Sequence, residues 1–419
     1  MSRRRLLAGG LVGGAAAVTG SLAVSAARSS ASASSAGASA DHVVETGIVA
    51  AAHDTVPFHG AHQAGVLTPP QAAGVFVALD AIAPDRASLA QGFRTLTARA
   101  RIAAAGFTPT PTPRSQPQDD SGILGPVVPP DGLTVTVGVG ASLFDSRYGL
   151  GHLRPAGLTM MPVFPNDRID PAQVHGDVLV QLCANSVDTC LRALRDLLRR
   201  TRGAFAVRWL MEGFHTPSKE GVGATGRNLL GFKDGTANPV REDPQVADTL
   251  IWSQPADAPW AEGGTYQVVR LIRMLVEFWD RVSLSEQEGM IGRRRDTGAP
   301  LDGNGEFDTP GYSRDPAGDV IPLSAHIRLA NPRQATTDAS RILRRGYSYS
   351  RGFDTAGNLD MGLIFSCFNA DVHRQFEVVQ GRLDGEPLED YVKPFGGGYF
   401  FVLPGVRGPN DWYASALLS

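Results

Sequence analysis

The sequence predicts an α+β fold made of two ferredoxin-like halves, each with the element order β-α-β-β-α-β. The first observation is that strand-like alternation and helix-like spacing follow one another in this order over residues 73–214. The second is a weaker recurrence of similar patterns after residue 231, as an internal duplication would give. We therefore expect residues 41–220 and 221–419 to form two ferredoxin-like domains in a dimeric α+β barrel type of architecture.

The patterns of the first half are well separated. Residues 73–83 and 133–140 alternate as strands do, and a helical repeat runs from Leu89 through Phe93 to Leu96 between them. The remaining expected elements are strands at 177–184 and 204–214 and a helix at 187–200, whose apolar stripe is Leu191, Leu194, Leu197 and Leu198. Together they complete one ferredoxin-like unit.

The second half shows the same kinds of pattern less clearly. We expect strands at 265–276, 326–330, 362–369 and 399–405, and helices at 277–281, 285–291 and 372–383. No short repeat of the kind found in solenoid proteins is present, which disfavours that class of fold.

The first forty residues have the features of an export signal. Arg3, Arg4 and Arg5 precede Leu-Leu and an uncharged run rich in glycine and alanine, and residues 31–40 contain only Ser, Ala and Gly. This pattern resembles a twin-arginine signal, with cleavage near Ala38-Ser39-Ala40 one option and a permanent membrane anchor the alternative. We expect an exported protein, either secreted, periplasmic or attached to the cell envelope, with no stable membrane span after signal removal. The twin-arginine route carries folded proteins, which suits a chain that binds a cofactor before export.

The charge balance argues against nucleic acid as a partner. The chain has 39 basic and 42 acidic residues, and four of the basic ones but none of the acidic ones lie in residues 1–40. The mature chain is therefore more acidic than the whole chain, whereas nucleic-acid-binding proteins carry clustered positive charge.

Cysteines and histidines give few motifs. The three cysteines form no CxxC or CxxCH, which disfavours thiolate metal sites and covalently attached haem. Cys183 and Cys190 could pair as a disulfide or remain free thiols. His59 and His62 have a spacing that can bind metal, but no third ligand is close in sequence. Motifs of zinc peptidases, α/β-hydrolases, P-loop proteins and dinucleotide-binding proteins are absent.

The stretch GFKDGTANP, residues 231–239, places Asp234 between two glycines. Asp-Gly commonly forms a tight turn because both residues tolerate left-handed backbone geometry. Alternatively, the glycines let a large ligand approach the backbone while Asp234 faces it.

A second candidate group lies downstream. His326 is within SAHIRLANP, where a lone histidine is most often a structural hydrogen-bonding group. It is followed by the cationic segment RILRRGYSYSRG and by GLIFSCFN, whose Leu363, Phe365 and Phe368 could line a flat apolar cofactor or pack in an ordinary core.

Five motifs, GFKDGTANP, SAHIRLANPR, RILRRGYSY, MGLIFSCFN and PFGGGYFFVLPG, occur in an order that resembles the dye-decolorizing peroxidase family. PFHGAHQAGVLTPPQ near the N-terminus also resembles that family, and the export signal points to its deferrochelatase-like branch. The resemblance covers the chain from about residue 54 to the end. It implies two ferredoxin-like halves and one haem b per chain, bound without a covalent link.

Residue by residue, the resemblance makes His326 the axial ligand of the haem iron and Asp234 the distal acid. Arg344 matches the distal arginine, with Arg345 the alternative in the same Arg-Arg-Gly. Leu363 and Phe365 would line the distal side. Asp390 would accept the other N–H of the imidazole and so strengthen its donation to iron. The resemblance also leads us to expect a tyrosine where this chain has His59.

These assignments imply an oxidoreductase that reduces hydrogen peroxide while oxidising dyes, phenols or other bulky donors in one-electron steps. Asp234 and Arg344 would promote cleavage of the peroxide bond, and Trp412 and Tyr413 are conceivable surface electron relays. Two other classes stay open: an exported protein that releases iron from haem, and an exported solute-binding protein without catalysis. A homo-oligomer is compatible with all three.

Overall fold

The computed structural model describes residues 55–216, 225–254 and 258–419. The expected signal and linker, residues 1–40, lie outside the described residues. Within the described part, no helix combines the length and apolar character needed to cross a membrane.

The elements of the first half match the predicted order. The strands are β1 (Ala73–Ala81), β2 (Thr134–Gly140), β3 (Val178–Ala184) and β4 (Phe205–Phe214), and the helices are α2 (Arg86–Ala105) and α3 (Val187–Arg200). Asp85 caps α2 by accepting a hydrogen bond from the Ser88 N–H, and Gly106 ends the helix with a φ of 71°. Leu194 and Leu197 of the predicted α3 stripe are buried.

The second half has shorter helices. Its strands are β5 (Thr265–Met274), β6 (Leu343–Arg344), β7 (Tyr347–Phe353), β8 (Leu359–Asn369) and β9 (Val392–Val402). Its helices are α4 (Pro244–Leu250), α5 (Val276–Trp279), α6 (Leu284–Ile291), α7 (His326–Ala330) and α8 (Val378–Leu383), the last preceded by a π-helical turn at His373–Glu377. A final short helix, α9 (Ser415–Leu418), closes the chain.

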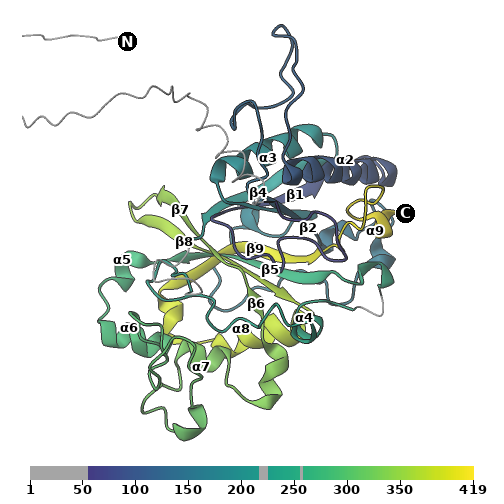
Figure 1. The fold of residues 1–419 in the computed structure, drawn as a ribbon. Coiled ribbons are helices and arrows are strands. Elements are labelled where there is room, and N and C mark those ends of the chain that lie inside the picture. The colour runs from purple at the N-terminus through teal and green to yellow at the C-terminus, as the bar shows by residue number, and fades with distance from the viewer. Residues whose placement is uncertain (1–54, 217–224, 255–257) are drawn as a thin grey trace, which may run out of the picture. The chain divides into compact units, whose positions relative to one another are not determined.

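The strands form a closed antiparallel barrel (Figure 1). The described strands pair in the order β5-β9-β2-β3-β1-β4-β7-β8, and pairing of β8 with β5 closes the ring, with β6 added at the end of β8. Each half contributes four adjacent strands, and in both halves the first, second, third and fourth strands of the unit lie in the order 2-3-1-4. The fold prediction of two ferredoxin-like halves in a barrel is confirmed.

The two faces of each strand have different environments. Val269 and Leu271 of β5 belong to an apolar cluster that includes residues of β1, β3, β4, β7, β8 and β9. The alternate side chains Arg270, Ile272 and Met274 line a cavity on the other face of β5. Helix α3 packs beside β1 and β3, and α2 packs against α3 and β2, while α5 to α8 lie at the second half (Figure 1).

One predicted element is wrong. Residues 326–330 form the helix α7 rather than a strand, with the Arg328 and Leu329 N–H groups donating to the Ala325 carbonyl. Five residues are too few for their alternation to separate a strand from a single helical turn. Pro332 follows closely and cannot continue the helix, which explains why α7 is so short.

Other sequence features are structural in this part of the molecule. All three cysteines are buried free thiols, so Cys183 and Cys190 are not paired. His62 hydrogen-bonds to the Gly263 carbonyl and stacks on Trp252. Among the described residues, no group of three or more His, Cys, Asp or Glu side chains is arranged to hold a metal ion.

Candidate haem site

A cavity lies between the second-half sheet and the short helices α6 to α8. The cavity has a volume of about 270 Å³, and most of its wall is apolar. Side chains of β5, β8, α6, α7 and α8 and of the loop 228–237 contribute to this wall. Five of the six predicted site residues line the cavity: Asp234, His326, Arg344, Leu363 and Phe365.

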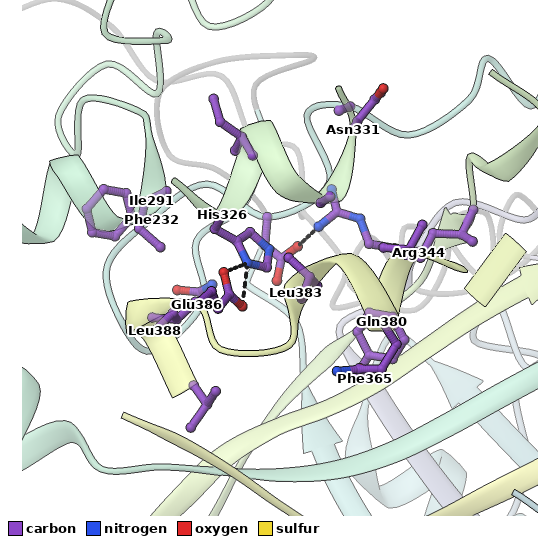
Figure 2. A pocket seen from close by; sticks show the side chains of 18 of the residues that line it. Phe232, Ile291, His326, Asn331, Arg344, Phe365, Gln380, Leu383, Glu386 and Leu388 are labelled. Carbon is purple, nitrogen blue, oxygen red and sulfur yellow. Dashed lines mark hydrogen bonds and ion pairs between the residues drawn. The ribbon is translucent and has the colours of Figure 1, made fainter. Parts of the chain in front are cut away.

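His326 is the first residue of α7, and its ring is held by a carboxylate. Its Nδ1 lies 2.8 Å from Oε2 and 3.0 Å from Oε1 of Glu386, which is buried (Figure 2). Burial lowers the pKa of His326, but the charge and hydrogen bond of Glu386 outweigh this effect, so the pKa is raised. With Nδ1 held by Glu386, the ring's other nitrogen, Nε2, is left for a ligand.

The carboxylate that holds His326 is therefore Glu386 and not Asp390, so this prediction is corrected. Asp390 is exposed, lies at the end of the 3₁₀ turn Pro387–Asp390, and is not part of the cavity wall. Glu386 immediately precedes that turn and is buried. The segment EPLED contains three carboxylates, and only the path of the turn decides which one faces the imidazole.

Asp234 and Arg344 form an ion pair at the same cavity. Arg344 Nη1 donates to Asp234 Oδ1 at 2.9 Å, and each side chain is a little over one quarter exposed. The two residues are far apart in sequence, but pairing of β6 with β8 brings Arg344 to the cavity beside Phe365. In Figure 2, Arg344 lies to the right of His326, and Phe365 lies below Arg344 in the view.

A residue that sequence reasoning did not assign, Asn238, fixes the backbone of Arg344. The Asn238 side chain donates to the Arg344 carbonyl at 2.8 Å and accepts from the Arg344 N–H at 3.1 Å. The segment GFKDGTANP thus contacts Arg344 twice, through Asp234 at the guanidinium and through Asn238 at the backbone. The Asn-Pro dipeptide was visible in the sequence, but its partner was not.

The glycines of this segment adopt backbone conformations that favour glycine. Gly231 has a φ of 86° and Gly235 a φ of 120°, so the turn expected at Asp-Gly is present. The turn and the cavity are not alternatives, because the same bend presents Asp234 to the cavity wall.

The Arg344–Arg345 ambiguity has a geometric answer. Arg345 is buried away from the cavity wall and donates to the Thr68 carbonyl and the Gln71 side chain, which tie it to the first half. Only Arg344 of the two lines the cavity. Adjacent residues of an extended segment point in opposite directions, which accounts for the difference.

Only two of the three apolar residues that the sequence suggested for the cofactor wall line the cavity. Leu363 and Phe365 line the cavity, whereas Phe368 packs in a separate cluster with Ile251 and Leu343. The wall also includes residues that sequence reasoning missed, among them Phe232, Met274, Ile291, Leu383 and Leu388. Trp412 and Tyr413 are buried in the core next to α2 and β2, not at the surface.

Two buried polar atoms in the wall point to a missing partner. Arg270 Nη1 and Tyr312 Oη have no hydrogen-bonding partner among the described residues, although both side chains are at least nine-tenths buried and line the cavity. Burial raises the pKa of Tyr312 to about 12, so its phenol is neutral. Buried polar groups in folded proteins are nearly always hydrogen-bonded. A large, mostly apolar ligand with polar edges would fit this wall, and haem has both properties.

Comparison with known proteins identifies the family of this chain. The N-terminal model of the Dyp-type peroxidase family matches residues 63–215, and the C-terminal model matches residues 225–407. The chain belongs to the Dyp-type peroxidase family. This confirms the family resemblance, and it makes the chain an oxidoreductase that acts on peroxide with a reducing co-substrate.

Relatives of this peroxidase are similar over most of their length. Deferrochelatase of Escherichia coli strain K12 is 52% identical over 375 residues, 88% of each chain. Deferrochelatase of Shigella sonnei is 50% identical over 424 aligned positions, 100% of this chain and 97% of that protein.

Solved structures agree with this assignment. The DyP-type peroxidase of Cellulomonas bogoriensis is 37% identical, with a TM-score of 0.78, over 87% of this chain and 98% of that one. Ferric DtpA of Streptomyces lividans is 35% identical, with a TM-score of 0.78, over 87% and 97% of the two chains. Together with the family match, the ferric and oxyferrous forms of that relative imply that this peroxidase binds haem.

Proposed function

We propose that this peroxidase is an exported enzyme that holds one haem b per chain through non-covalent contacts, with His326 as the axial ligand of the iron. The single observation that carries the proposal is that two residue pairs, His326–Glu386 and Asp234–Arg344, lie at the same cavity. On one side the carboxylate of Glu386 orients His326, and elsewhere on the wall Asp234 and Arg344 form an ion pair. Neither pair alone would be specific, because isolated ion pairs are common in proteins.

Glu386 acts on the axial ligand. Its carboxylate accepts the Nδ1 proton of His326, which fixes the tautomer that leaves Nε2 free to donate to iron. When bound, haem would supply an iron atom and a conjugated ring that can exchange electrons one at a time. Leu363, Phe365 and Met274 belong to the apolar wall, which would keep water away from a bound haem.

Asp234 and Arg344 act on the peroxide. Asp234 moves a proton from one oxygen of hydrogen peroxide to the other, so that the departing oxygen leaves as water. Arg344 stabilises the negative charge that develops on the departing oxygen. The balance of the reaction is simple: hydrogen peroxide gains two electrons and two protons and becomes two waters, while two donor molecules lose one electron each. Dyes and phenols are the donor classes that we propose.

The test is to load the purified mature chain with haem b and to follow peroxide-dependent oxidation of a dye or phenol. We expect a Soret band with one haem per chain, extraction of the haem by acid butanone, and turnover that Asp234→Ala and Arg344→Ala each lower by about 100-fold or more. Both variants should keep the Soret band. Turnover at the wild-type rate in both variants would contradict the assigned roles, and the absence of a Soret band would contradict haem binding altogether.

A second candidate function has one specific observation in its favour: the relatives that share about half of their residues with this chain are named deferrochelatases. The candidate activity is release of iron from haem. It is tested by adding a reductant and a ferrous chelator to the haem-loaded protein and measuring porphyrin fluorescence, because release would require reduced iron to leave and two protons to replace it. Metal-free porphyrin formed in proportion to chelated iron would favour this activity. Peroxide turnover without any such porphyrin would favour the peroxidase proposal alone.

A further inference from the structure

The segment that carries Asp234 rests on a buried carboxylate outside the cavity wall, Glu306. Lys233 Nζ donates to Glu306 Oε2 at 2.6 Å, and Thr236 Oγ1 donates to Glu306 Oε1 at 3.1 Å. The Lys233 and Glu306 side chains are 4% and 7% exposed. Lys233 precedes Asp234 and Thr236 follows two residues later, so both flanks of Asp234 are tied to one carboxylate.

The segment that carries Glu306 is itself held in place. Arg293 is buried, and its Nη1 donates to the carbonyls of Gly298 and Glu306. Gly298 has a φ of 75°, and a Cβ there would come within 2.6 Å of the Lys233 side chain. The loop 293–306 therefore encloses the alkyl chain of Lys233 as well as binding its ammonium group, and a side chain at residue 298 would disturb this contact.

The charge of Glu306 matters because Lys233 lines the same cavity as Asp234 and Arg344. Burial raises the pKa of Glu306, but hydrogen bonds from Lys233, Thr225 and Thr236 and the Lys233 charge outweigh this effect, so its pKa is lowered. Because the folded pKa is below the ordinary value, this stabilisation is present above the ordinary pKa and is lost as the pH falls through the folded one. At neutral pH the Glu306 carboxylate therefore offsets the ammonium charge of Lys233, which lies next to Asp234 in the cavity wall.

Another buried ion pair shows what a purely structural pair looks like in this fold. Arg192 of α3 binds Asp120 in the loop after α2, with side chains 2% and 8% exposed. Neither partner lines the cavity, and neither is adjacent in sequence to a residue that does. The Lys233–Glu306 pair differs because one partner lies directly next to Asp234.

We propose that Glu306 is a positioning residue for the peroxide reaction: through Lys233 and Thr236 it holds the Asp234 carboxylate at the angle and depth at which Asp234 meets Arg344 and the bound peroxide. This inference rests on the proposed function and deepens it. Glu306 does not touch the reacting atoms. It acts through the backbone on either side of Asp234, and a shift of about 1 Å in a catalytic group costs on the order of 100-fold in rate.

The experiment compares the wild type with Glu306→Gln and with the double variant Lys233→Met/Glu306→Leu. The first keeps the shape of the side chain but removes its charge, and the second replaces the buried pair by apolar side chains, a change that stability often tolerates. In haem-loaded protein mixed with peroxide in a stopped-flow instrument, we expect each variant to lower the second-order rate constant of the spectral change by about 10- to 100-fold. In Glu306→Gln, whose changed residue lies outside the cavity wall, the haem content and the KM for the electron donor should stay within about twofold of the wild type.

Hydrogen exchange in the haem-free protein gives a readout that does not depend on activity. Backbone amides of residues 231–239 should exchange faster in both variants than in the wild type, with no change in α2 or α3. Asp120→Asn is the matched control: it removes the carboxylate of the Arg192 pair and should leave the peroxide rate constant and exchange at residues 231–239 unchanged.

The outcomes separate the inference from the function on which it rests. If the wild type loaded with haem does not react with peroxide, the proposed function fails. If the wild type reacts and either Glu306 variant reacts at the same rate, the positioning role is wrong and the pair is only structural. If Glu306→Gln does not fold, the double variant decides. A lower rate in Asp120→Asn as well would also overturn the proposal, because the effect would then follow from any lost ion pair.

Discussion

The two halves of the barrel share a strand order but use their outer faces differently. In the first half, α2 with 20 residues and α3 with 14 residues cover the sheet, and their apolar faces join the largest buried cluster. In the second half, α5 to α8 have four to eight residues each and leave a cavity between helices and sheet. One supersecondary unit thus serves as a filled core in one copy and as a binding site in the other, because helix length decides how much of the sheet is covered.

The largest effect is expected for His326→Ala, which tests whether haem binds in the cavity of the second half. His326→Ala removes the only proposed axial ligand, so we expect the protein to lose its native Soret spectrum and peroxide turnover to fall by about 1,000-fold or more. His152→Ala is the matched control, since His152 is exposed in the first half and not part of the cavity wall. Absorption spectra and haem titration of both variants give the answer. A normal spectrum in His326→Ala would assign the ligand to another residue.

Glu386→Gln should have the next largest effect, and it distinguishes the two carboxylates near the turn 387–390. A neutral amide holds the imidazole less firmly, and loss of such a partner typically costs 10- to 100-fold in metal affinity or activity. Asp390→Asn should change neither property by more than about twofold, because Asp390 is exposed. Haem dissociation rates and the reduction potential of the iron measure the difference. Equal effects of the two substitutions would remove the distinction that the structure draws.

The sequence predicted the filled half better than the half with the cavity. In residues 73–214 each helix and strand is long enough for its period to be read, and all six expected elements are present. In the second half, His326 sits in a five-residue helix that alternates like a strand, so its sequence period is uninformative. Asp234 and Arg344 were found through motif order, but Glu386 and Asn238 depend on turns and long-range contacts that no local pattern encodes.

Asn238→Ala, in the second half, should lower the rate of the peroxide reaction less than the substitutions above. The change leaves the Asp234–Arg344 ion pair in place but removes the two hydrogen bonds that fix the Arg344 backbone. Because a lost pair of this kind costs about 1–2 kcal/mol, a fall of about tenfold in the peroxide rate constant is expected. Asn185→Ala, at an exposed site of the first half, is the control. A rate constant equal to that of wild type in Asn238→Ala would show that Asp234 alone positions Arg344.

The smallest effect on turnover is expected for a core substitution in the first half. Leu197→Ala in α3 creates a cavity in the main core, so the free energy of unfolding should fall by about 2–5 kcal/mol. Turnover per folded, haem-loaded molecule should stay unchanged, because no residue of α3 lines the haem cavity.

Leu388→Ala is the matched substitution in the second half. Leu388 is buried to a similar degree, at 7% exposed against 4% for Leu197, but it belongs to the cavity wall. Leu388 packs in the apolar cluster around Trp279 and also faces the cavity, so we expect Leu388→Ala to weaken haem binding as well as lower the stability of the haem-free protein. Chemical unfolding of the haem-free protein and haem titration separate the two quantities. If both leucines lowered stability and haem affinity in the same ratio, the two halves would not divide folding and binding between them.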